Sequence, residues 1–257
     1  MVWVYLHKQQ LERRLHKYLI MKTPTLFFAL LLGLLGLYAC QSDSDRQDES
    51  MAEDQPPIRG NLFVRYIEDD KRLKAEAYFF EGKDETDTKP KHFKGGVQFL
   101  GSGMGERSIG DRYYKYQYEN TLAWQDNYSF SLTDDAGKTH RFSFGESPKP
   151  LTSFELPPAF SKSKTTYISF SPAHLPEGSY VAALLTDADK KVATTKVKGP
   201  SEEGKLAITP KLLEKMKNGE VEVYLVRVDS KRIEEPPFSL GFTLEYYTPI
   251  KKTGIQP

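Results

Sequence analysis

The apolar residues of this chain recur at every second position over most of its length, and this period of two restricts the fold more than any other feature. In stretches such as 61–68 and 73–80, aromatic and β-branched residues alternate with polar ones. Short segments rich in Gly, Asp and Asn separate these stretches. The pattern indicates half-buried β-strands, and many short strands of this kind are typical of a sandwich or a barrel.

The first group of expected strands ends at a proline-containing segment. The expected strands are 61–68, 73–80, 92–100, 112–118, 128–132 and 139–144. The segment 145–150 (GESPKP) then contains two prolines and no other apolar side chain. Because proline cannot donate to a sheet ladder, this segment predicts a domain boundary, with a first domain over 58–146.

A second group of expected strands follows and predicts another domain over 151–249. These strands are 153–156, 165–170, 178–185, 192–197, 206–208, 220–228 and 239–247. A short helix is expected within 209–219, since Thr209 is a suitable N-cap, Pro210 suits the first turn and Gly219 suits the exit. Strands of this number and length resemble those of immunoglobulin-like domains. The expected fold is therefore all-β, with two tandem immunoglobulin-like β-sandwich domains.

The amino-terminal part of the chain has a different character. Residues 26–37 (LFFALLLGLLGL) are uncharged and apolar, but too few to span a bilayer as a helix, which needs about 20 residues. A run of this length after Met21 and Lys22 matches the core of a secretory signal peptide. It is followed by Leu37-Tyr38-Ala39-Cys40, which contains the single cysteine and resembles the lipobox of bacterial lipoprotein precursors.

The resemblance implies that Cys40 becomes the first residue of the mature chain and carries diacylglycerol on sulfur, with an acyl chain such as palmitate on its amine. Two or more acyl chains give stable membrane anchoring. Residues 1–39 are then leader and signal peptide, with translation expected to start at Met21 rather than Met1. Residues 40–57 are polar and acidic, and we expect them to form a flexible tether.

The lipoprotein resemblance also implies a location. Gln41 is not the aspartate that retains lipoproteins in the inner membrane of Gram-negative bacteria, so anchoring in the outer membrane is expected. The acidic tether resembles surface-export signals, but whether the domains face outward or toward the periplasm stays open.

Composition and motifs exclude several function classes. Acidic residues slightly outnumber basic ones from Cys40 onward, which argues against nucleic-acid binding. No second cysteine, histidine pair, catalytic triad or phosphate loop is present, so we expect no metal, no cofactor and no enzymatic activity. Asp134-Asp135 and Asp187-Ala188-Asp189 fit hairpin turns better than calcium sites.

One strand carries the candidate binding residues. Within 112–119 (RYYKYQYE), Tyr114, Tyr116 and Tyr118 point to one face. If that face is buried, it belongs to the sandwich core. If it is exposed, the rings, together with Trp124, are candidates for binding sugar rings or a protein partner.

Two functional hypotheses follow. The first is a non-enzymatic binding or scaffold role through the immunoglobulin-like domains, with a protein or glycan partner. The second is a surface lipoprotein that binds or processes carbohydrate. The first rests on what such folds usually do, and the second on the tyrosines.

Overall fold

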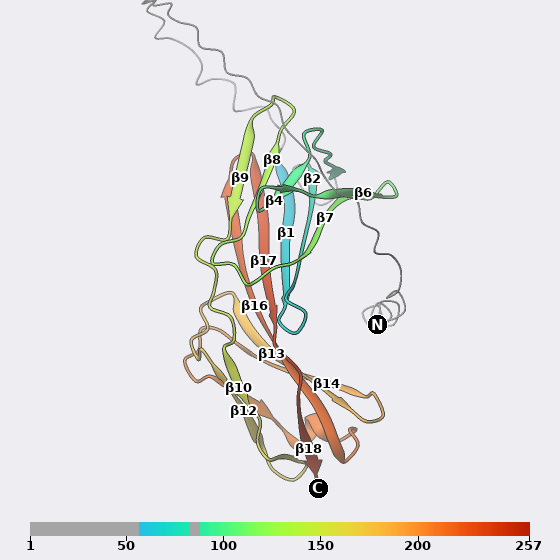
Figure 1. Ribbon diagram of the computed structural model, residues 1–257, viewed down its shortest axis with the longest axis vertical. Helices are drawn as coiled ribbons and strands as arrows, with labels where there is room; N and C mark the ends of the chain where they lie inside the picture. Colours follow the sequence, from blue (N-terminus) through green and yellow to red (C-terminus); the bar gives the residue numbers. More distant parts are fainter. Residues whose placement is uncertain (1–56, 83–87) are drawn as a thin grey trace, which may run out of the picture. The chain divides into compact units, whose positions relative to one another are not determined.

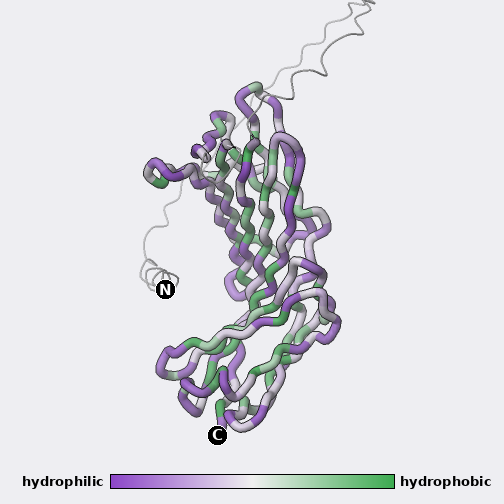
Figure 2. Tube along the Cα trace, turned by 180° about the vertical axis from the view of Figure 1, so that it is seen from behind, coloured by the Kyte–Doolittle hydropathy of each residue, from purple (hydrophilic) through white to green (hydrophobic). Residues whose placement is uncertain are grey.

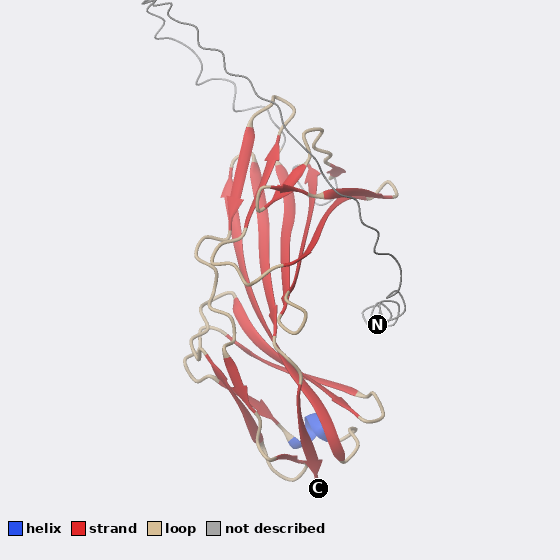
Figure 3. Ribbon diagram, in the orientation of Figure 1, coloured by secondary structure: helices blue, strands red, loops and turns tan. Residues whose placement is uncertain are grey.

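The computed structural model describes residues 57–82 and 88–257, all of which belong to one unit of the chain, Glu49–Pro257. The predicted signal peptide, Cys40 and nearly all of the tether lie outside the described residues. Within the described part, no helix is long and apolar enough to cross a bilayer. The all-β prediction is confirmed: in the part of the chain that the structure describes, strands form several sheets in a sandwich-like arrangement, with one short helix (Figure 3).

The largest element is one long sheet of eleven strands, with the central order β11-β18-β16-β17-β1-β2-β7-β6. Strand β13 pairs with β16 and with β14, and β3 pairs with β2. The strands of this sheet are β1 (Ile58–Ile67), β2 (Arg72–Glu81), β3 (Lys89–Pro90), β6 (Gly105–Ile109), β7 (Tyr113–Thr121), β11 (Ala159–Ser161), β13 (Ser179–Asp187), β14 (Val192–Lys198), β16 (Gly219–Glu235), β17 (Phe238–Tyr247) and β18 (Lys251–Gln256).

Two small sheets pack against the long sheet. The four-stranded one, which we call the amino cover, has the order β5 (Ser102–Gly103), β4 (Val97–Phe99), β8 (Ser129–Thr133) and β9 (Thr139–Ser143). The three-stranded one, the carboxy cover, has the order β10 (Ser153–Glu155), β12 (Thr166–Ser171) and β15 (Lys205–Ile208).

Strand β16 runs beneath both covers (Figure 1). Its first part pairs with β18 and β13, and its last part pairs with β17. Val221, Val223 and Leu225 are buried, and so is Ile233 on the same alternating face. Because a strand presents every second residue to one side, both covers pack on the same face of the long sheet.

Aromatic side chains fill the space under the amino cover. Phe130 and Phe142 of the cover contact Phe242 and Phe238 of β17, with ring centroids 5.5 and 5.0 Å apart. Hydrophobic and hydrophilic residues alternate along these strands (Figure 2). Each fully buried aromatic ring stabilises the fold by about 1.5–3 kcal/mol through removal of its apolar surface from water.

Strand pairing crosses the domain boundary that the sequence predicts. β17, assigned by sequence to the second domain, lies between β16 and β1 and runs parallel to β1 of the first domain. The segment 144–150 does join the amino cover to the carboxy cover. Because the long sheet contains strands from both predicted domains, the division into domains at 58–146 and 151–249 stays a prediction.

The predicted helix is present but short. α1 (Pro210–Leu213) begins after Thr209, whose hydroxyl accepts a hydrogen bond from the Leu212 backbone N–H at 3.4 Å. This N-cap satisfies one of the N–H groups that a helix start leaves without a partner. Leu213 and Met216 are buried against the core.

Candidate functional site

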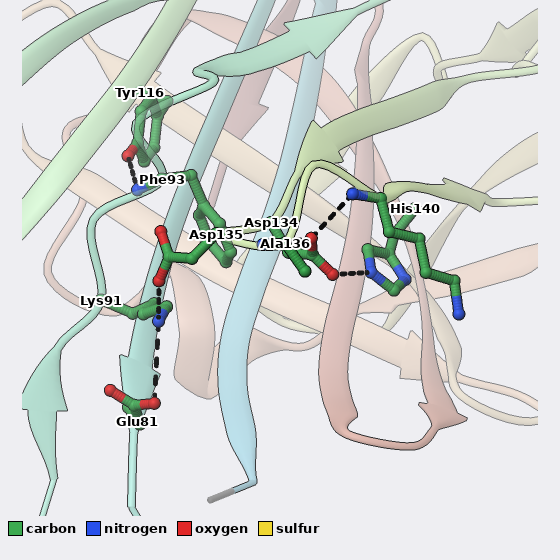
Figure 4. Close-up of polar contacts among 9 residues, drawn as sticks. Glu81, Lys91, Phe93, Tyr116, Asp134, Asp135, Ala136 and His140 are labelled. Carbon is green, nitrogen blue, oxygen red and sulfur yellow. Dashed lines mark hydrogen bonds and ion pairs between the residues drawn. The ribbon is translucent and has the colours of Figure 1, made fainter. Parts of the chain in front are cut away.

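The three candidate tyrosines lie on the inner face of β7. Tyr116 is fully buried, and its hydroxyl accepts a hydrogen bond from the Phe93 backbone N–H at 3.0 Å (Figure 4). Burial raises the pKa of Tyr116 to about 12. A side chain so placed satisfies a backbone group in the core, because a buried N–H needs a partner.

The other candidate aromatics are half-buried against the same core. The ring of Tyr118 lies 5.3 Å from that of Phe99, and the ring of Tyr114 lies 4.8 Å from the His92 imidazole. Trp124 makes edge-to-face contacts elsewhere in the core, at 5.3–5.5 Å from the rings of Tyr66, Tyr128 and Tyr246. These side chains thus share a core without forming one open surface, and ligand binding by them stays a prediction.

The aspartates of the first hairpin hold the turn together (Figure 4). Asp134 accepts hydrogen bonds from the backbone N–H groups of Ala136 and Lys138 and from the His140 imidazole at 2.8 Å. The His140 bond is the main reason that the pKa of Asp134 is lowered. Asp135 pairs with Lys91 at 3.0 Å. Among the described residues, no group of acidic, His or Cys side chains is arranged to hold a metal.

A different site lies on the face that carries both covers. It is a hollow of about 540 Å³ beside β16, which we call the central hollow. Three parts of the chain form it: the segment 144–149 between the covers, the loop after β12, and the paired strands β13 and β16. Its lining residues are Phe144, Glu146, Ser147, Pro148, Lys149, Pro172, His174, Pro176, Glu177, Ser179, Arg227, Asp229, Ser230 and Lys231.

Arg227 and Asp229 of β16 form a buried ion pair in the wall of the central hollow. Their side chains are 5% and 6% exposed, and two hydrogen bonds of 2.9 and 3.1 Å join them. Asp229 also accepts from the Ser179 hydroxyl, and Arg227 donates to the Lys149 backbone carbonyl. A buried charge needs a partner of this kind, so the pair fixes both strands and the segment above them.

Two further polar side chains of the central hollow have no hydrogen-bond or ion-pair partner among the described residues. Ser147 is 8% exposed, and its hydroxyl has no hydrogen-bond partner among the described residues. The ammonium group of Lys231 lies 5.2 Å above the ring of Phe144, and burial lowers its pKa. An unpaired buried hydroxyl costs about 1–3 kcal/mol, and a ligand group that bonded to it would recover part of that cost.

A glycine lets the loop after β12 approach β16 closely. Gly178 has φ of 79°, and a Cβ at this position would lie 2.7 Å from the Ser230 carbonyl oxygen. The Ser230 N–H donates to the Gly178 carbonyl at 3.2 Å. Only glycine combines this backbone conformation with so close an approach, so Gly178 helps to close one side of the central hollow.

The sequence prediction missed the central hollow, although one signal was present. Arg227, Asp229 and Lys231 continue the alternating face of Val221, Val223 and Leu225. Charged residues in phase with a buried apolar face are unusual, because Arg, Asp and Lys are almost never fully buried unless paired. These charged residues mark the site. The sequence prediction did not use them, because it ended the strand at Val228 and left Asp229 and Lys231 outside it.

Comparison with protein-family models and with curated proteins gives no match for this chain.

Proposed function

We propose that this chain is a lipid-anchored, non-enzymatic binding protein of the outer membrane of a Gram-negative bacterium. In this proposal Cys40 carries the anchor, residues 41–57 form the tether, and two tandem immunoglobulin-like sandwich domains present the binding site. The central hollow is that site. The lipobox-like sequence supports the anchor, and the hollow supports the binding role.

The observation that carries the binding role is the construction of the central hollow. A concave site of about 540 Å³ falls in the size range of ligand sites, and its polar groups converge from separate parts of the chain. The buried carboxylate of Asp229 is held by Arg227 and Ser179, so it is not free to act as a general base. Such an arrangement favours binding without chemistry.

A crosslinking experiment in cells tests this role. A photo-activatable benzophenone residue replaces Lys149, whose side chain makes no hydrogen bond or ion pair with another described residue and whose carbonyl bond to Arg227 belongs to the backbone. The matched control places the same residue at the exposed Ser153 of β10, outside the hollow. Light-dependent adducts at position 149 alone would support the proposal, and adducts at neither position would contradict it.

Membrane fractionation and protease treatment of intact cells test the anchor. The Cys40→Ala chain should leave the membrane fraction, while the parent stays in it. Digestion of the parent in intact cells would mean that the domains face outward, and protection until the outer membrane is opened would mean that they face the periplasm. A Cys40→Ala chain that remains firmly membrane-bound would contradict lipid anchoring.

The second candidate function is carbohydrate binding or processing at the surface. It was expected at Tyr114, Tyr116, Tyr118 and Trp124, but Tyr116 is fully buried and the others are half-buried against the core. The central hollow offers this function a different location, with polar side chains beside the ring of Phe144 and three prolines.

A further inference from the structure

We infer that the central hollow binds a neutral saccharide. The inference rests on the binding role proposed above and adds the chemical class of the ligand. It depends on four properties of the hollow: its balanced charge, the unused hydrogen-bonding capacity of its rim, the Ser147 hydroxyl without a partner among the described residues, and the pairing of both edges of β16 at Asp229.

The formal charges around the central hollow cancel. Three cationic residues, Arg227, Lys149 and Lys231, are matched by three anionic ones, Asp229, Glu146 and Glu177. The imidazole of His174 is hydrogen-bonded to the carboxylate of Glu202. A strongly anionic ligand would meet the carboxylates, and a cationic one the ammonium and guanidinium groups. A ligand without net charge avoids both repulsions.

The rim retains hydrogen-bonding groups of both kinds. Lys149 and Lys231 offer ammonium donors, while Glu146 and Glu177 offer carboxylate acceptors, and none of these four side chains makes a hydrogen bond or ion pair with another described residue. Ammonium groups only donate, and ionised carboxylates only accept. A hydroxyl group does both, so a molecule with several hydroxyls can use the whole rim.

The Ser147 hydroxyl is a further hydrogen-bonding group in the wall of the hollow. It makes no hydrogen bond to any residue that the structure describes and exposes almost no surface, although the Ser147 backbone N–H donates to the Asp126 carbonyl. Because Ser147 belongs to the lining of the hollow, a ligand hydroxyl that reached its side chain would supply the missing partner. The apolar surfaces of Phe144 and Pro148 suit the C–H faces of a sugar ring.

The strands beside the central hollow argue against an extended peptide. At Asp229, β16 is paired on one side with Ser179 of β13 and on the other with Leu244 of β17. Both edges of β16 are therefore occupied at Asp229, and a peptide cannot add itself as a further strand at this point of the wall. Recognition at this place must come from side chains, which is how compact ligands are bound.

Titration calorimetry of the full chain in detergent tests the inference. The neutral probes are the hexasaccharides of maltose, cellulose, chitin, xylan and mannan type, and the comparison probes are hexagalacturonate and an uncharged hexapeptide. We expect at least one neutral probe to bind, with a dissociation constant that changes less than about twofold between 50 and 500 mM salt, because screening acts only on charged partners.

A pair of matched variants separates binding from folding. Ser147→Ala removes an unpartnered hydroxyl in the hollow, and Thr166→Val removes an unpartnered hydroxyl elsewhere. Neither loss breaks a hydrogen bond to a described residue, and each removes a buried hydroxyl without a partner, so both variants should be at least as stable as the parent. Ser147→Ala should weaken saccharide binding about two- to tenfold, the loss of one hydrogen bond, and Thr166→Val should leave it unchanged.

The alternative outcomes overturn different statements. Binding of hexagalacturonate or the hexapeptide in place of the neutral probes, or a steep salt dependence, would refute the saccharide class. No saccharide binding together with specific crosslinks at position 149 would refute it and leave the binding role standing. No saccharide binding and no crosslinks would refute both.

Discussion

Removal of Asp229 should destabilise the protein more than removal of any exposed charge. Its carboxylate accepts three hydrogen bonds, two from Arg227 and one from Ser179, in a place where both charged side chains are only 5–6% exposed. In Asp229→Ala the guanidinium group stays buried without a counter-charge. The expected loss in the free energy of unfolding is about 3–5 kcal/mol.

The double variant distinguishes a lost ion pair from lost packing. Arg227→Met should cost a similar amount, because it leaves the Asp229 carboxylate buried and alone. In Arg227→Met/Asp229→Leu no charge is left buried, so the combined cost should fall at least about 2 kcal/mol below the sum of the two single costs. A double variant as stable as the parent would agree with this reasoning.

Equilibrium unfolding in urea measures these costs, with the Cys40→Ala chain as the common background. The midpoint should shift while the slope stays constant, since the surface exposed on unfolding changes little. Glu220→Ala provides the control, because Glu220 pairs with Lys252 at 2.8 Å with both side chains more than half exposed. That variant should lose less than about 1 kcal/mol. Asp229→Ala with a cost no larger than that of the control would refute the reasoning.

Three further predictions concern the core and the turns. Phe242→Ala should lower the free energy of unfolding by about 3–5 kcal/mol in urea titrations, because the ring is fully buried, and half-buried Phe144→Ala should cost less; the reverse order would contradict the packing. Tyr116→Phe should cost about 1–3 kcal/mol and speed hydrogen exchange of the Phe93 amide, which loses its acceptor; unchanged exchange would be contrary. The pKa of Asp187 is lowered, first by the Lys217 backbone N–H, so its stabilising effect is present above the ordinary pKa of about 4 and is lost as pH falls through the lower folded value. The Asp187→Asn protein should therefore lose less stability than the parent when the pH falls below 4, as measured by thermal unfolding. An equal loss of stability in the two proteins would argue against this.

Local patterns were sufficient to predict most strands. Alternation within 61–68 and 73–80 corresponds to β1 and β2, and capping by Thr209 correctly predicts the start of α1. β16 was cut short at Val228, because the run from Asp229 to Arg232 is polar and resembles a turn. The structure shows that the strand continues through this run, although Ser230, Lys231 and Arg232 are exposed, and Ile233 after it is buried.

Contacts between distant parts of the chain could not be predicted from local patterns. Arg227 meets the Lys149 carbonyl 78 positions away, and this contact helps to build the central hollow. The parallel pairing of β1 with β17 has no local signal either, because pairing partners depend on the whole topology. The tyrosine face of β7 illustrates the same limit: its alternation is visible in the sequence, but whether it is covered depends on distant strands.

The position of β17 has a kinetic consequence. Arg65 of β1 and Glu245 of β17 are 180 positions apart, yet they face each other across neighbouring strands. Closing so long a loop costs entropy before any contact is gained, and folds with such distant pairings form slowly. During synthesis, β1 and β2 must wait for almost the whole chain to emerge before the sheet around them is complete. The nascent chain therefore has a long interval in which the edge of β1 that later pairs with β17 is unpaired and open to chaperones or to aggregation.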